Sequence, residues 1–223
     1  LEKERNMETK KIVILDDHRV VIEGIKTALN ERPDFDVVGE TTDGADAVDM
    51  VRRLKPDIVI TDVSMPGMNG MDFTLEVMKI DPEIRVIVFS MYSDKEYIID
   101  FLRAGVGSYV LKEEPLGELM FALSGVARGG FYLGRKMHRV LVDHLAGLSA
   151  GEDEVGGLHS LSLREREIFI MLAEGLSVKR ISDRLNISPK TVESHKYNIM
   201  EKLDVGTVVE LTKLAIRNNL ISA

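Results

Sequence analysis

The chain has 223 residues, of which 44% are hydrophobic and 30% are charged, with a formal net charge of −8 and no Cys. This is the composition of an ordinary globular protein, and no apolar stretch reaches the roughly 18 residues that a membrane span needs. Disulfides and cysteine-based zinc sites are excluded, so we expect a cytoplasmic protein with no membrane partner.

Charge is unevenly distributed along the chain. Residues 161–223 contain 10 Lys and Arg against 8 Asp and Glu, whereas the rest of the chain contains 19 against 29. The acidic first part should repel nucleic acid, whereas the net positive charge of residues 161–223 allows binding to it. Residues 1–6 are charged, show no periodicity and precede Met7, so they are interpreted as an added remnant or a disordered extension.

Five short apolar runs alternate with amphipathic stretches between residues 11 and 128. The runs are rich in Val and Ile and lack polar alternation, which is typical of strands buried on both faces; they cover residues 11–15, 36–39, 57–61, 85–89 and 108–111. The amphipathic stretches show helical spacing and cover residues 18–31, 43–53, 71–80, 94–104 and 115–128. Five βα units predict an α/β domain with a doubly wound parallel sheet over residues 10–130.

Carboxylates follow the first and third predicted strands where each strand ends. Asp16 and Asp17 follow one run, and Asp62 follows the other. Open parallel sheets bind their ligands at this edge, and three converging carboxylates need a cation to stay ionised. Without Cys or a nearby His, the expected ion is a hard one such as Mg²⁺. A single Asp at a strand end is as often a helix cap or a turn residue as a metal ligand. Three such residues together are much less often only caps or turns.

This arrangement suits phosphoryl transfer to a carboxylate. Asp62, on the central strand, is the natural nucleophile toward phosphorus, while Asp16 and Asp17 are natural metal ligands. Ser90 ends the fourth strand and can donate to a phosphoryl oxygen, and Lys112 ends the fifth strand and can pair with the same group. Taken singly, Ser90 also fits a turn and Lys112 a solvated charge.

Residues 10–130 resemble the receiver domain of bacterial two-component response regulators. The resemblance rests on Asp16-Asp17, on Asp62 followed by Met65-Pro66-Gly67, on Ser90, and on Tyr109 three positions before Lys112. It implies that Asp62 accepts a phosphoryl group from a histidine kinase, and that the backbone carbonyl of Ser64 joins Asp16, Asp17 and Asp62 on Mg²⁺. It also implies that Ser90 and Tyr109 form a switch. Ser90 stands where Thr is commoner and keeps the hydroxyl.

A connecting region over residues 131–160 follows the predicted receiver. It contains an amphipathic stretch from about Arg135 to Leu145 and then the Gly-rich and acidic stretch 147–157, which predicts a flexible linker. Beyond it the strand signal is absent. Four helices are predicted over residues 161–223, at 163–174, 178–185, 189–203 and 207–218. Ser188 can cap the third helix and Pro189 can take its first position, so the second and third helices form a helix-turn-helix.

The third of these helices has one apolar and one polar side. Val192, Ile199 and Leu203 fall together and must face the core, whereas the opposite side presents polar side chains suited to base edges and phosphates. A plain solvated face is the alternative interpretation. The residues expected to contact DNA are Lys190, Thr191, Glu193, Ser194, Lys196, Tyr197 and Lys202.

Residues 161–223 resemble the LuxR-type DNA-binding domain, through Leu161 to Glu167, Gly175-Leu176-Ser177, Thr191-Val192 and Lys202-Leu203. With the receiver, this is similar to the NarL/FixJ family of response regulators. The resemblance implies binding of double-stranded DNA and a homodimer, formed on activation through the last helix. That helix has too many apolar residues for one stripe, and the expected dimer face is Val208, Leu211, Leu214 and Ala215. Glu193 stands where this family usually has Lys; a carboxylate there can accept from cytosine and weakens the attraction to phosphates.

Three other functions fit the sequence less well than a phosphorylation-controlled transcription regulator. A magnesium-dependent phosphatase would need an acid two residues after the nucleophile, where this chain has Ser64. A constitutive DNA-binding protein would have a degenerate acidic site, and a nucleotide-binding fold would rest on Gly105-Val106-Gly107 alone. We therefore expect no enzyme beyond a receiver that catalyses its own Mg²⁺-dependent phosphorylation and dephosphorylation.

Overall fold

The computed structural model describes residues 9–93, 95–138, 141–142, 157–185, 187–218 and 220–221. It divides into two compact units, Leu1–Ala150 and Gly151–Ala223, which are described separately. The expected extension at residues 1–6 and residues 147–156 of the expected linker lie outside the described residues. Across the described ranges, the structure contains no helix whose length and hydropathy would let it cross a membrane.

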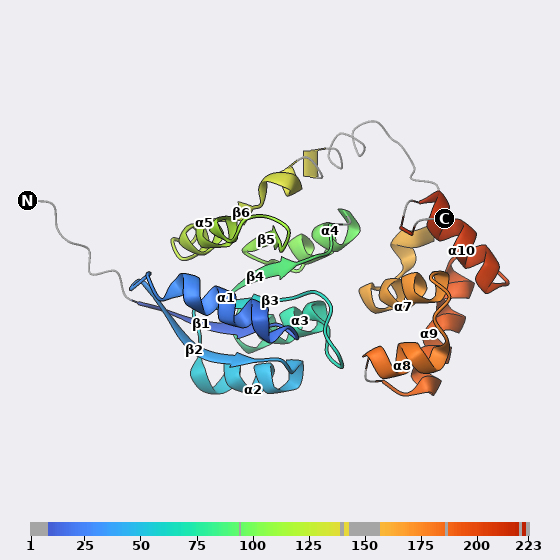
Figure 1. The fold of residues 1–223 in the computed structure, drawn as a ribbon, viewed down its shortest axis with the longest axis horizontal. Helices are drawn as coiled ribbons and strands as arrows, with labels where there is room; N and C mark the ends of the chain where they lie inside the picture. Colours follow the sequence, from blue (N-terminus) through green and yellow to red (C-terminus); the bar gives the residue numbers. More distant parts are fainter. Residues whose placement is uncertain are drawn as a thin grey trace, which may run out of the picture. The chain divides into compact units, whose positions relative to one another are not determined.

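The first unit is built on a parallel sheet with the strand order β2-β1-β3-β4-β5-β6 (Figure 1). Its strands are β1 (Lys10–Leu15), β2 (Phe35–Thr41), β3 (Ile58–Thr61), β4 (Arg85–Ser90), β5 (Ser108–Leu111) and β6 (Tyr132–Leu133). The five predicted strands and the doubly wound order are confirmed. The sixth strand was not predicted, because two residues are too few to show a period.

Helices cover both faces of the sheet (Figure 1). The helices α1 (Arg19–Leu29) and α5 (Leu116–Val126) share one apolar core with the sheet, in which Ile25 and Leu123 are almost fully buried. The helices α2 (Gly44–Leu54) and α3 (Gly70–Ile80) pack against each other, and α4 (Lys95–Arg103) packs against β5. With both faces covered by helices, a ligand can reach this sheet only at the ends of its strands.

The second unit is helical in its described residues. It contains the 3₁₀ turn η1 (Gly157–Ser160) and the helices α7 (Leu163–Ala173), α8 (Val178–Leu185), α9 (Pro189–Lys202) and α10 (Val208–Arg217). Capping boxes start α7 and α10, and the predicted Ser188 cap starts α9 with Pro189 in the first turn. The four predicted helices are therefore confirmed within one or two residues.

The packed part of the second unit begins before Leu161, the residue at which we expected it to start. Leu158 is 8% exposed and belongs to the same apolar core as Phe169 and Ile199. Its carbonyl oxygen accepts a hydrogen bond from Arg166 Nη2 at 3.0 Å. In the expected helix from Arg135 to Leu145, residues 135–138 and 141–142 are helical, and residues 139–140 and 143–145 lie outside the described residues.

Candidate functional site

The acidic residues predicted from the sequence meet at the carboxyl edge of the first unit's sheet. Asp62 N donates to Leu15 O at 3.1 Å, which aligns the ends of β1 and β3. Lys112 N donates to Ser90 O at 2.8 Å, which aligns the ends of β4 and β5. Asp16 and Asp62 are only 2% and 6% exposed. Parallel pairing thus brings together side chains that are up to 96 positions apart in the chain.

Lys112 lies between two of these carboxylates. Its Nζ is 2.6 Å from Asp62 Oδ2 and 2.7 Å from Asp16 Oδ2, and its side chain is 8% exposed, so it is no solvated charge. Burial alone would lower the pKa of Lys112, but the carboxylates of Asp62 and Asp16 outweigh burial and hold that pKa above its usual value. Burial raises the pKa of the Asp16 carboxyl in spite of Lys112. One ammonium group therefore does not fully compensate the carboxylates around it.

The carboxylates can hold a metal ion. Ligand atoms of Asp16, Asp17, His18 and Asp62 all lie within 4.8 Å of one another. Asp17 Oδ1 is buried and accepts no hydrogen bond among the described residues, although His18 Nδ1 lies 2.7 Å from it. The expectation that no His lies near the site is thus wrong. The ring of His18 is largely exposed, however, and the buried donors are carboxylate oxygens, which fit a hard divalent cation.

Turn and capping roles account for only part of these carboxylates. The N-cap of α1 is His18, whose side chain makes no capping hydrogen bond. Asp16 Oδ1 accepts from His18 N at 2.9 Å and Asp62 Oδ1 accepts from Val63 N at 2.6 Å. In both residues the other oxygen binds Lys112. Local backbone bonds orient each carboxylate and leave its second oxygen for the pocket.

The loop after Asp62 is fixed by the close approach of α3. Gly70 N donates to Val63 O at 2.8 Å, and Asn69 caps α3 by accepting from Asp72 N. A Cβ at Gly70 would lie 1.9 Å from the carbonyl oxygen of Asp62, so only glycine fits there. Ser64 lies half-buried within this loop, beside the acidic pocket in sequence.

Ser90 and Tyr109, the two predicted switch residues, are both fully buried. Ser90 ends β4, next to β3, and its Oγ accepts from Tyr92 N at 3.4 Å. Tyr109 lies on β5, donates its hydroxyl to Tyr92 O at 2.8 Å and packs edge-on against Phe101. Both side chains therefore contact the same residue, Tyr92, in the segment between β4 and α4.

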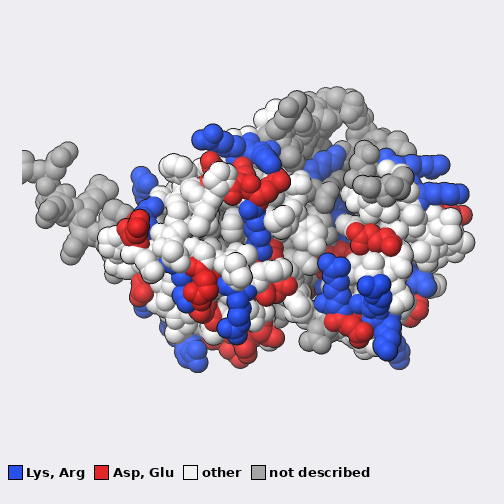
Figure 2. Space-filling model, viewed as in Figure 1, with Lys and Arg blue, Asp and Glu red and all other residues white. Residues whose placement is uncertain are grey.

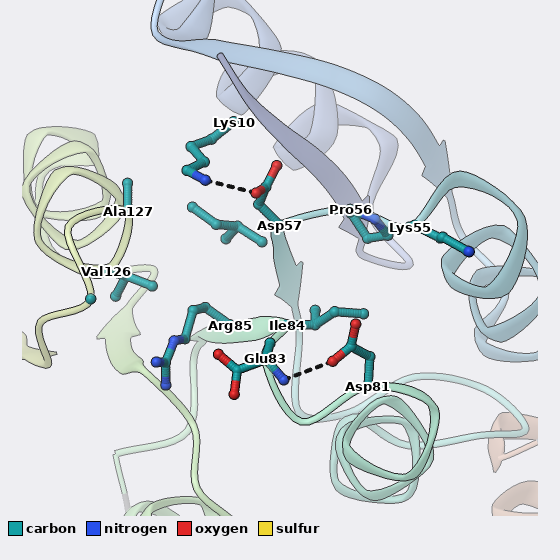
Figure 3. Close-up of a pocket in the computed structure, with 12 residues that line it drawn as sticks. Lys10, Lys55, Pro56, Asp57, Asp81, Glu83, Ile84, Arg85, Val126 and Ala127 are labelled. Atoms are coloured by element: carbon teal, nitrogen blue, oxygen red, sulfur yellow. Dashed lines mark hydrogen bonds and ion pairs between the residues drawn. The ribbon is translucent and has the colours of Figure 1, made fainter. Parts of the chain in front are cut away.

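A hollow of about 300 Å³ lies at the opposite, amino-terminal edge of the same sheet (Figure 3). Lys10 Nζ pairs with Asp57 Oδ1 at 2.8 Å on one wall, and Asp81 accepts from Glu83 N on the other. Its lining mixes three basic and three acidic side chains. It is separate from the acidic pocket, which lies where the strands end.

In the second unit, α9 presents a polar face. Val192 and Ile199 are fully buried, as predicted, while six of the expected DNA-contacting residues are exposed: Lys190, Thr191, Glu193, Ser194, Tyr197 and Lys202. Tyr197 is 69% exposed, far more than a core aromatic. Basic side chains also gather over α8, which carries Lys179, Arg180 and Arg184 (Figure 2). The α8 residues were not among the predicted DNA contacts, although the spacing of Arg180 and Arg184 at i, i+4 indicates this basic face in the sequence.

Two of the expected DNA contacts lie on the flanks of α9. Lys196 is half-buried and its Nζ is 3.6 Å from Glu193 Oε2. Lys202 Nζ lies 2.6 Å from Glu165 Oε2, the carboxylate that also closes the capping box of α7. Lys202 thus joins α9 to α7 within the unit.

The expected dimer face on α10 needs a correction. Leu211 and Ala215 are fully buried in the core of their own unit, where α10 packs on α7, so they cannot meet a partner. Val208 and Leu214 are half-buried. The exposed apolar residues of this helix are Val209, at 63%, and Ile216, at 37%.

Comparisons with known proteins agree with this two-part organisation. Residues 12–124 match the response regulator receiver domain, and residues 159–215 match the luxR family of bacterial regulatory proteins. The oxygen regulatory protein NreC of Staphylococcus haemolyticus is 37% identical over 95% of this chain and 99% of its own. The transcriptional regulatory protein DegU of Brevibacillus brevis is 32% identical over 94% of both.

Solved structures of RcsB from Salmonella resemble the chain at similar coverage. One has a TM-score of 0.68 and 27% identity, over 93% of this chain and 96% of its own. Another, bound to a promoter in the presence of the phosphomimetic BeF₃⁻, has a TM-score of 0.64 and 29% identity, over 97% of this chain and all of its own.

Proposed function

Because this chain belongs to the two-component response regulators with a LuxR-type DNA-binding domain, we propose that phosphorylation of Asp62 by a histidine kinase controls its binding to DNA. It is a transcription regulator and not an enzyme of metabolism. The observation that carries the proposal is the position of Asp62: buried at the end of β3, with Oδ2 2.6 Å from Lys112 Nζ. We place its action in the cytoplasm, where the kinase's phosphoryl donor and DNA are both accessible.

The chemistry follows from the contacts of Asp62. A carboxylate oxygen of Asp62 attacks the phosphorus of a phosphohistidine, the new O–P bond forms as the P–N bond breaks, and the imidazole leaves with the electron pair of that bond and takes up a proton. Lys112 is positioned to pair with the phosphoryl oxygens, where it offsets negative charge. Burial of both groups strengthens that attraction.

A magnesium ion fits the remaining oxygens. Asp16, Asp17 and Asp62 would hold it, with the backbone carbonyl of Ser64 as a fourth protein ligand. The buried Oδ1 of Asp17, which accepts no hydrogen bond among the described residues and lies 2.7 Å from His18 Nδ1, supports this assignment. When bound, Mg²⁺ would neutralise charge on the phosphoryl oxygens.

The switch would connect Asp62 to the surface through Ser90 and Tyr109. Ser90 lies on the strand beside Asp62 and can donate its hydroxyl to a phosphoryl oxygen. That movement would disturb the segment at Tyr92, which both Ser90 and Tyr109 contact. Phosphorylation would then shift the receiver between two states and release or dimerise the DNA-binding domain.

DNA recognition would use the helix-turn-helix formed by α8 and α9. The exposed face of α9, including Lys190, Ser194 and Tyr197, would enter the major groove, and the basic residues of α8 would contact phosphates. A homodimer formed on activation would read two half-sites. We assign its contact on α10 to the exposed Val209 and Ile216.

Phosphate incorporation from acetyl phosphate and Mg²⁺, followed by intact-mass spectrometry, tests the acceptor. The wild type and the matched variant Asp49→Ala, whose side chain is 81% exposed, should gain one phosphoryl group. Asp62→Ala should gain none while keeping its circular dichroism spectrum. Equal incorporation in all three proteins would contradict the assignment of Asp62.

A further inference from the structure

The chain that leaves the receiver is attached to the same loop that carries Lys112. We call residues 131–138 the connector segment and residues 112–115 the β5–α5 loop. After α5 the connector segment returns to the sheet, where β6 pairs with β5: Tyr132 N donates to Gly107 O and Gly134 N donates to Tyr109 O, both at 3.1 Å. It then starts a helix at Arg135, whose third residue, Met137, is 1% exposed.

Two consecutive carboxylates of the β5–α5 loop bind one residue of the connector segment. Glu113 Oε1 lies 2.7 Å from Lys136 Nζ. Glu114, which is 8% exposed, accepts from Lys136 N through Oε1 and from Leu111 N through Oε2, each at 3.3 Å. Glu114 thus bridges the end of β5 and the first helical turn of the connector segment.

Neighbouring contacts leave little freedom for this arrangement. Glu118, on α5, accepts from the hydroxyl of Tyr132 and pairs with Arg135 Nε at 3.2 Å. A Cβ at Gly134 would lie 2.3 Å from Glu114 Oε2, so a side chain there would displace that carboxylate. The absence of a side chain at position 134 is therefore a requirement of the Glu114 contact.

We propose that the β5–α5 loop transmits phosphorylation directly to the connector segment, in addition to any movement of Ser90 and Tyr109. The inference rests on the proposed phosphorylation of Asp62. Lys112 Nζ now binds the Asp62 carboxylate at 2.6 Å, and one residue further along the chain begins the pair of carboxylates that bind Lys136.

The direction of the effect follows from where new charge would appear. A phosphoryl group adds negative oxygens beyond the present Oδ2 of Asp62, and the ammonium of Lys112 must move outward to pair with them. The loop moves with it. The two 3.3 Å hydrogen bonds of Glu114 are the longest in the arrangement and give way first, which loosens the connector segment that leads toward the DNA-binding unit.

Hydrogen-exchange mass spectrometry of the full chain tests this, with and without beryllofluoride and Mg²⁺. In the wild type, peptides covering 131–138 should exchange roughly tenfold faster with beryllofluoride, as expected when the hydrogen bond from Lys136 N to Glu114 is lost, while peptides around Asp62 become protected. Glu114→Gln and Gly134→Ala should show the fast exchange without beryllofluoride and little further change with it. The matched control Glu83→Gln, an exposed carboxylate at the other edge of the sheet, should behave as the wild type.

The outcomes separate this inference from the proposed function. Protection around Asp62 with unchanged exchange at 131–138 would overturn the link and leave the phosphoacceptor in place. No protection around Asp62 in any protein would overturn both. If either variant is too unstable to purify, Glu113→Gln, which removes only the exposed ion pair with Lys136, should give a smaller increase in the same direction.

Discussion

Single residues set the charge balance of the acidic pocket. Three carboxylates meet there, two of them bind the ammonium group of Lys112, and burial raises the pKa of Asp16 even though Lys112 binds it. Such a site gains from an added cation more than an ordinary surface cluster does, because buried charges are poorly screened by water. Asp17 supplies the oxygen that no protein hydrogen bond satisfies among the described residues.

Mg²⁺ should therefore stabilise the receiver through Asp17. At about ten times the dissociation constant the gain is about 1.4 kcal/mol, visible as a rise in the unfolding temperature. Asp17→Asn should weaken this response, whereas Asp49→Asn, an exposed matched control, should keep it. Thermal unfolding across a Mg²⁺ titration measures both. An unchanged response in Asp17→Asn would remove this residue from the metal site.

Glu165 is a second residue whose charge matters, in the DNA-binding unit. Burial alone would raise its pKa, but hydrogen bonds from Lys202 and Ser162 outweigh burial and hold that pKa below the usual 4.5. Because the folded-state pKa is depressed, the carboxylate stabilises the folded state at pH above the unfolded-state value. That contribution is lost as pH falls through the lower folded-state value.

Glu165→Gln should lower the free energy of unfolding by about 1–3 kcal/mol at pH 7, since a charge-assisted hydrogen bond becomes neutral. The difference from the wild type should shrink at an acid pH below the depressed pKa of Glu165, where the wild-type carboxylate takes up its proton. Urea unfolding at both pH values measures this. Glu201→Gln, exposed on α9, is the control and should show no such pH dependence. A constant difference across pH would show that Glu165 acts through packing alone.

At this scale the sequence predicted the residue types of the pocket and not all of their neighbours. Asp16, Asp62 and Lys112 stand at strand ends, so the topology alone brings them together. The involvement of His18 was missed, because the sequence does not show whether the side chain next to a metal ligand is directed toward the same site. The pairing of Lys202 with Glu165 joins residues 37 positions apart on two helices, and no local pattern encodes which side chain fills that space.

Elements show where periodicity is sufficient evidence. The five long strands are continuous Val- and Ile-rich runs and were predicted, whereas β6 has two residues and was not. The helix α10 has apolar residues around much of its surface, and spacing could not choose between two stripes. The structure places Leu211 and Ala215 against the core, and Thr212 Oγ1 donates to Ala173 O of α7 at 3.2 Å.

The two stripes of α10 should respond differently to truncation. Leu211→Ala should lower the free energy of unfolding by about 2–5 kcal/mol, because it opens a cavity in a fully buried position. Val209→Ala, at a position 63% exposed, should change stability by less than about 0.5 kcal/mol and weaken the activated dimer. Urea unfolding and light scattering measure these effects. A stable Leu211→Ala protein that no longer dimerises would restore the original assignment of the dimer face.

At the scale of the whole molecule, two units of different charge share one chain. The first 160 residues carry 19 Lys and Arg against 29 Asp and Glu, whereas residues 161–223 carry 10 against 8 and present basic residues on α8 and α9 (Figure 2). The charge distribution therefore favours attraction of DNA to the second unit, and the proposed phosphoryl chemistry belongs to the first. The proposed function depends on coupling between them, which neither unit's fold determines alone.

DNA binding with and without beryllofluoride and Mg²⁺, on wild type and Asp62→Ala at one fixed salt concentration, tests that coupling most directly. The account predicts that the wild type alone binds DNA at least about tenfold more tightly in beryllofluoride, with a molar mass by light scattering that rises from monomer toward dimer. Equal affinity and equal mass for both proteins in every condition would contradict it, and would mean that the receiver does not control DNA binding through Asp62.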